Sequence, residues 1–171
     1  PIPDFQSIIL PLLQQFRDGK EHSIQEVVGE LAKVYSLSEQ EINELLPSGK
    51  QTTFYNRVGW ARTYLSKSGL LEMPRRSYHK ITARGKEVLK SNPARIDMKY
   101  LERFPEYVEF RERESARRKD QGDNDKDSAL QVGNRTPEEM LEYAYQEIRD
   151  NLAHEILAFV KKSSPAFFER L

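Results

Sequence analysis

The chain has 171 residues, no cysteine, 37% hydrophobic residues, and 27 basic residues against 27 acidic ones. The absence of cysteine excludes disulfide frameworks, thiolate zinc sites and cysteine nucleophiles, and because it fits a reducing compartment we expect a cytoplasmic protein. No apolar run reaches the roughly 20 residues that a membrane-spanning helix needs, so we expect no membrane partner.

Apolar residues at helical spacing predict four helices in the first part of the chain. They are expected at about residues 4–17, 24–34, 39–46 and 52–67. Ser23 with Glu26, and Ser38 with Glu41, have the spacing of capping boxes and mark the starts of the second and third helices. The short stretch 21–23 is expected to pair as a strand.

A basic hairpin follows the fourth helix. Residues 70–73 and 78–81 have the composition of strands, and the turn between them carries Arg75 and Arg76. Ser77 stands where glycine is expected to be common in such a turn. Helices followed by a two-stranded ribbon with a basic tip describe a winged helix-turn-helix. We therefore expect a mainly α (α+β) fold with a small β wing.

Composition divides the chain into three parts. Residues 1–110 are expected to form the winged-helix domain, which the apolar residues between 96 and 110 complete by packing back on it. Residues 111–135 are highly charged and hold few large apolar residues, which indicates a flexible polar linker. The Thr-Pro-Glu-Glu run at 136–139 then opens a long amphipathic helix, and residues 136–171 are expected to start a second domain that is truncated here.

The zero net charge of the chain conceals a strong internal asymmetry. Residues 50–86 contain nine Lys or Arg and one acid, a net charge of +8, so the remaining residues carry −8. A basic patch that coincides with one compact unit is the electrostatic signature of binding a polyanion, usually nucleic acid.

The fourth helix is expected to present one face to DNA. At 100° per residue, Phe54, Val58, Ala61 and Leu65 form a buried stripe, and the opposite side carries small polar residues. We expect three of these to face bases, because amides and threonine methyls make contacts in the major groove; they are Thr52, Asn56 and Thr63. Five cations are the expected phosphate contacts; they are Lys50, Lys67, Arg75, Arg76 and Lys80. Whether Arg57 and Arg62 contact DNA or are structural stays open.

No catalytic or metal-binding constellation is recognisable. The three histidines, His22, His79 and His154, are isolated from one another and from partners at ligand spacing, and they are expected to be ordinary surface or packing residues. Nothing resembles a P-loop, a dinucleotide fingerprint or a nucleophile elbow. We expect no catalytic residue and no cofactor in this chain.

Several runs resemble Mrr-type restriction endonucleases, including Arg-Val-Gly-Trp-Ala at 57–61 and Ser-Pro-Ala-Phe-Phe-Glu at 164–169. Further runs at 46–50, 68–71, 81–85, 104–107 and 136–141 extend the resemblance over nearly the whole chain. It implies a winged-helix DNA-binding domain, a linker and a nuclease domain of the PD-(D/E)xK type, in type IV enzymes that act on modified, typically methylated, DNA. The family's catalytic Asp and Lys have no counterparts here, so the resemblance implies that cleavage and its magnesium belong to a longer parent.

Two other functions stay open. The first is a winged-helix transcription regulator that forms a homodimer through its long C-terminal helix. The second is a winged helix that binds proteins and never contacts DNA. A flat response of duplex binding to salt would favour the second, since each phosphate contact contributes roughly 0.9 to the log–log slope.

Overall fold

The computed structural model describes residues 1–120 and 133–162, and it divides the chain into two compact units. The first unit, Pro1–Thr136, is called the head below; in the second, Pro137–Leu171, the described residues form one long helix. The elements of the head are α1 (Phe5–Gln15), β1 (His22–Ser23), α2 (Ile24–Val34), α3 (Glu39–Ile42), α4 (Thr53–Lys67), β2 (Leu71–Arg75), β3 (Tyr78–Ile81), α5 (Ala83–Lys90), α6 (Met98–Leu101) and α7 (Pro105–Asp120). The second unit holds α8 (Pro137–Lys162).

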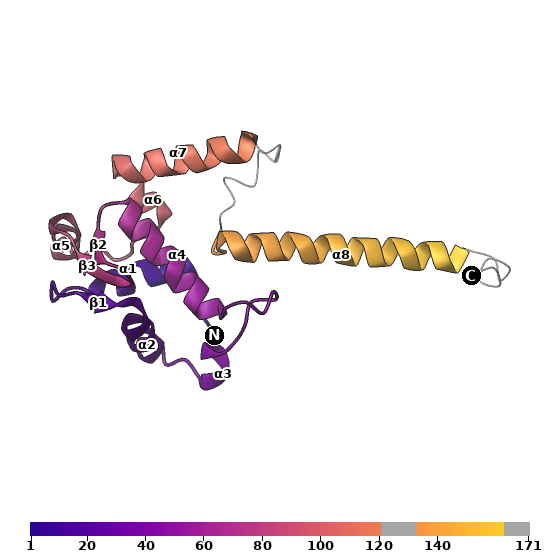
Figure 1. Ribbon diagram of the computed structural model, residues 1–171, viewed down its shortest axis with the longest axis horizontal. Coiled ribbons are helices and arrows are strands. Elements are labelled where there is room, and N and C mark those ends of the chain that lie inside the picture. Colours follow the sequence, from indigo (N-terminus) through magenta and orange to yellow (C-terminus); the bar gives the residue numbers. More distant parts are fainter. Residues whose placement is uncertain (121–132, 163–171) are drawn as a thin grey trace. The chain divides into compact units, whose positions relative to one another are not determined.

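The expected fold class is confirmed: the head is mainly helical with one small antiparallel sheet, consistent with a winged-helix-like α+β fold. The strand order is β1-β3-β2, so the short β1 pairs with the returning strand of the hairpin through His22 opposite His79. α4 packs mainly against α1 and also contacts β2 and α7 (Figure 1). The order of helices, β1 and the β2–β3 hairpin resembles that of a winged helix-turn-helix, in which α4 corresponds to the helix that precedes the hairpin.

One apolar core joins these elements. α1 contributes five fully buried side chains, from Phe5 to Leu13, and both predicted capping boxes are present at the starts of α2 and α3. α3 is shorter than expected because the chain leaves it at Asn43, whose side-chain amide donates to the carbonyl of Glu39. The following residues form a separate turn in which Leu45 pairs with Thr52. This ordered connection sets the start of α4.

The wing turn depends on a strained residue. Ser77 has φ +66°, in the left-handed region that glycine adopts without steric cost. We expect Ser77→Gly to raise the free energy of unfolding by about 0.5–1 kcal/mol, because the relief of strain exceeds the added backbone entropy of glycine. Chemical denaturation measures the change, and an unchanged or lower stability would contradict the strained turn.

Residues 111–120, expected to belong to the linker, instead continue α7 to Asp120. Tyr107 and Phe110 anchor the start of α7 against Tyr64 of α4, at ring-centroid distances of 5.9 and 6.4 Å. Ion pairs at helical spacing, Arg113 with Glu109 and Arg117 with Glu114, support the exposed part. A charged segment rich in helix formers thus extends a helix that packing has already started. The rest of the expected linker, residues 121–132, lies outside the described residues.

α8 has no buried residue, and its large apolar side chains, from Leu141 to Val160, are exposed. The long helix expected after Thr136 is present as α8. Among the described residues, no helix combines the length and apolar character needed to cross a bilayer.

Candidate nucleic-acid interface

The buried side of α4 is the predicted one. Phe54, Val58, Ala61 and Leu65 are each at most 1% exposed, and Tyr64 joins them. Thr52 is the N-cap: its hydroxyl accepts a hydrogen bond from the backbone N–H of Tyr55 at 3.3 Å. The helix is therefore fixed in rotation by its packing on α1 and in position by its cap.

The outward side of α4 differs from the predicted one. Tyr55, which is exposed, and Gly59, Arg62 and Ser66, which are partly exposed, lie together on this side, and we call these four residues the outer face. Tyr55 is 41% exposed, and a Cβ built on Gly59 would have no neighbouring atom within 4 Å. The outer face is thus open at its centre, and a duplex could approach the backbone of the helix closely there.

Asn56, which was expected to face bases, does not lie on this face in the structure described. It is 4% exposed, and the hydroxyl of Thr136 donates a hydrogen bond of 2.6 Å to its side-chain Oδ1. Thr136 itself is fully buried. A segment 80 residues further along the chain therefore covers a side chain that helical periodicity places outside.

The other two residues expected to face bases, Thr52 and Thr63, are partly exposed, as are Gly59, Arg62 and Ser66. Thr52 uses its hydroxyl as the cap of α4, and Thr63 donates its hydroxyl to the carbonyl of Gly59 at 3.0 Å. Both side chains lie at the edge of the outer face rather than at its centre. Sequence periodicity assigned no contact to Tyr55 or Ser66 and left the role of Arg62 open. The signal that could have found them is the aromatic pair Trp60 and Tyr64, because these rings contact each other and Tyr64 also contacts Tyr107 of α7.

The five expected phosphate contacts lie in three places. Lys50 is exposed in the connection before α4. Lys67 is exposed at the end of α4, with its Nζ 5.2 Å from the centroid of the Phe110 ring on α7. The remaining three belong to the wing: Arg75, Arg76 and Lys80.

The wing cations differ in whether they already form ion pairs or ring contacts within the head. Arg75 pairs with Glu21 at 2.8 Å, which raises the pKa of the guanidinium, and it stacks on Tyr78 with 3.5 Å to the ring centroid. Arg76 is exposed at the tip, and Lys80 faces Glu72 across the hairpin. For Arg76 and Lys80, the described residues show no ion pair within 4.0 Å. Arg76 is thus the wing cation most available to a phosphate.

The structure gives different surroundings to three other arginines of residues 50–86, including the two whose role the sequence left open. Arg57 is structural, because its guanidinium donates to the carbonyls of Ile2 and Pro3 at 3.0 and 2.9 Å. Arg62 belongs to the outer face, near enough to β3 for its charge to act on His79. Arg84 is held by Glu106 and by the carbonyl of Ser68.

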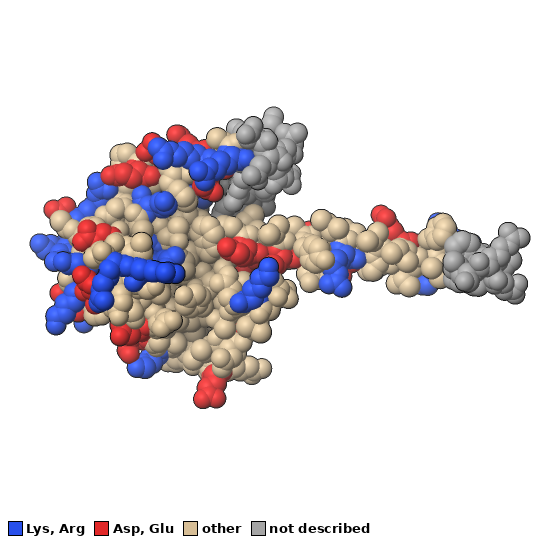
Figure 2. Space-filling view, viewed as in Figure 1, with Lys and Arg blue, Asp and Glu red and all other residues tan. Residues whose placement is uncertain are grey.

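The cations of residues 50–86 therefore do not all form one surface. Figure 2 shows Lys and Arg side chains over the part of the head that holds the sheet and α5, and again along α7, with acidic side chains among them. The surface that could contact DNA includes fewer of these cations than the sequence indicates. It consists of the outer face of α4, which contains Arg62, and it is flanked by Lys50 and by the wing tip. Among the described residues, no group of three or more His, Asp or Glu could hold a metal ion.

His79 makes the stability of the head depend on pH. It is 3% exposed, and burial first, then the charge of Arg62, lowers the pKa of its imidazole below the usual 6.5. The unfolded chain binds the proton more readily, so the free energy of unfolding should fall as pH drops below about 6.5, by at most about 1.4 kcal/mol per pH unit. Denaturation between pH 7.5 and 5 measures this slope, above the range where the carboxylates titrate. His79→Gln should flatten it, and an equal slope in both proteins would contradict the assignment.

Comparison with known proteins identifies a family for the first part of the chain. The family model of the Mrr N-terminal domain matches residues 5–91, half of the chain, from α1 to the end of α5. The type IV methyl-directed restriction enzyme EcoKMrr of Escherichia coli (strain K12) is 26% identical over 172 residues, which cover 98% of this chain and 56% of that enzyme. The chain thus spans about half the length of the curated relative that it matches. No solved structure matches it.

Proposed function

The chain belongs to the Mrr N-terminal domain family, and from this membership we propose that its head binds double-stranded DNA as the recognition region of a restriction endonuclease. The observation that carries the proposal is the open outer face of α4 between Lys50 and the basic wing tip. In a winged helix this helix enters the major groove, and the wing contacts the neighbouring backbone. We assign base contacts to Tyr55, Arg62 and Ser66, and phosphate contacts to Lys50, Arg75 and Arg76.

The similar enzyme is named methyl-directed, and we propose methylated DNA as the target of this protein too. An exposed aromatic ring such as Tyr55 beside an open glycine suits an added methyl group, because both are apolar and the backbone there leaves room. Binding of the chain to matched duplexes with and without methylated bases tests this. Equal affinity for both would refute the proposed target while leaving DNA binding intact.

Cleavage belongs, in this proposal, to the remainder of a longer parent enzyme. The described residues offer no ligand cluster for the magnesium that a PD-(D/E)xK nuclease uses. α8 would begin the nuclease domain, and its exposed apolar side chains would pack there. The alternative, a homodimeric regulator, would pack the same side chains against a second copy; sedimentation of the chain at increasing concentration distinguishes the two. We place the protein with its DNA in the cytoplasm.

The wing gives the direct test of DNA binding. Arg75→Ala with Arg76→Ala should weaken binding to all duplex sequences alike, because phosphate contacts position the protein without reading bases. The slope of log affinity against log salt should fall by about 1–2, at the lower end if Arg75 stays on Glu21. Fluorescence anisotropy across a salt series measures both quantities.

A matched control removes the same charge elsewhere on the head. Arg113→Ala with Arg117→Ala takes two exposed arginines from α7, each of which already pairs with a glutamate of its own helix. These changes should leave the slope nearly as in the wild type. If the wing variant binds as the wild type does, or if the two variants behave alike, the proposed docking is wrong.

A further inference from the structure

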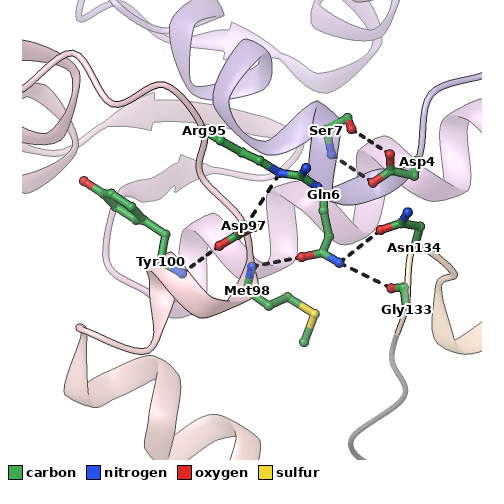
Figure 3. A network of polar contacts seen from close by, with 9 residues as sticks. All are labelled: Asp4, Gln6, Ser7, Arg95, Asp97, Met98, Tyr100, Gly133 and Asn134. Atoms are coloured by element: carbon green, nitrogen blue, oxygen red, sulfur yellow. Dashed lines mark hydrogen bonds and ion pairs between the residues drawn. The ribbon is translucent and has the colours of Figure 1, made fainter.

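Residues 133–136 return to the head and bind to it; we call this segment the clasp. The side-chain amide of Gln6 on α1 donates to the carbonyl of Gly133 and to Oδ1 of Asn134, at 3.4 and 3.3 Å (Figure 3). The Oε1 of Gln6 accepts from the backbone N–H of Met98 at 3.2 Å. Two residues after Asn134, Thr136 is fully buried and bonds to Asn56 of α4. The clasp thus joins α1 to the first turns of α4.

The clasp lies where a recognition helix would need space. An α-helix with its side chains is about 10–12 Å across, and the major groove of B-DNA is about 12 Å wide. A helix that enters the groove has no room for further chain on its flank. Recognition helices make their base contacts with their N-terminal residues, and Asn56 lies in that part of α4, next to Tyr55 of the outer face.

We propose that the clasp is autoinhibitory: closed over Asn56 it hinders the entry of the first turns of α4 into the major groove, and DNA binds tightly only when it opens. The inference rests on the proposed function, because it assigns a regulatory contact to the same surface. Opening would uncover an amide beside Tyr55, and a free asparagine can form two hydrogen bonds to adenine. The base contact expected from the sequence would then exist in the open state only.

The contacts suit a clasp that opens. The two bonds from Gln6 are at the long end of the hydrogen-bond range, and Gln6 itself is only partly buried. The short bond between Thr136 and Asn56 is the strong part, and it joins two groups that can each find partners in water or on DNA. A binding-competent state that is only fractionally populated lowers the apparent affinity by that fraction. Variants that weaken the clasp should therefore bind DNA more tightly.

Gln6→Glu tests the proposal in the full chain. The carboxylate keeps the acceptor for Met98 but loses the donor to Gly133 and Asn134. Gln14→Glu is the matched control, since Gln14 is exposed on the same helix and takes the same charge. Added negative charge alone weakens DNA binding, so we expect Gln6→Glu to gain roughly 3- to 10-fold in affinity over the wild type through release of the clasp, and Gln14→Glu to show no gain.

Thr136→Val provides a second, independent variant, because it removes the hydroxyl that bonds to Asn56 and changes the volume little. It should gain affinity as Gln6→Glu does, and adding Asn56→Ala should cancel the gain. Hydrogen exchange at residues 133–136 should be faster in both clasp variants without DNA, and faster in the wild type on addition of duplex. Faster exchange with unchanged or weaker DNA binding would overturn autoinhibition alone. If neither the wild type nor the variants bind duplex, the proposed function itself fails.

Discussion

Glutamate in place of Gly59 should reduce the affinity of the head for duplex DNA by at least roughly 30-fold, because like charges brought together in an interface cost several kcal/mol. A Cβ at this position meets nothing within 4 Å, so the new side chain projects from the centre of the outer face. The substitution should not unfold the head. Glycine inside an exposed helix costs about 0.5–1 kcal/mol relative to alanine, so the variant should be at least as stable as the wild type.

Gly29 gives a matched control for this variant. It is exposed on α2, and its Cβ would likewise have no neighbour within 4 Å. Gly29→Glu adds the same charge to the head without placing it on the outer face, so its loss of affinity should stay within roughly 3-fold at physiological salt. Anisotropy titrations of the wild type and the two variants measure their affinity for duplex DNA, and denaturation curves measure their stability. Equal losses for the two glutamates would show that the outer face of α4 does not enter the groove.

Local sequence signals predicted the elements well because their causes are local. The capping boxes at Ser23 and Ser38 and the buried stripe of α4 depend on residues three or four positions apart, and the structure contains them all. The hairpin with Arg75 and Arg76 near its turn follows from the same kind of short-range pattern. The fold class could therefore be predicted from the sequence.

The candidate site was only partly predictable, because distant contacts decide which side of α4 is open. Asn56 is covered by Thr136, and Arg57 is bound to the carbonyls of Ile2 and Pro3, each more than 50 residues away along the chain. Periodicity identifies the side of a helix that packs on the main core, but not a second contact that arrives later in the chain. For this reason the observed outward side of α4 is centred on Tyr55 and Arg62, whereas the predicted one was centred on Asn56 and Thr63.

A contact between segments distant in the sequence also explains why one glycine of the head should tolerate no side chain. A Cβ on Gly85, in the first turn of α5, would clash with the backbone carbonyl oxygen of Leu70 and would lie 2.6 Å from Cγ1 of Ile81. That carbonyl also accepts the backbone N–H of Thr82, the N-cap of α5, at 3.1 Å. The end of α4, the wing and α5 are therefore held together at a point where only glycine fits.

Gly85→Ala should lower the free energy of unfolding by about 3 kcal/mol, because inserting a methyl group into close-packed structure typically costs 1–3 kcal/mol and the rigid backbone cannot move aside. Gly59→Ala is the control with the same chemical change, and it should raise the free energy of unfolding by about 0.5–1 kcal/mol. Urea denaturation of both variants measures the two effects, which should have opposite signs. A Gly85→Ala protein as stable as the wild type would mean that α5 does not approach Leu70 so closely, and that the wing is not braced against α4 in this way.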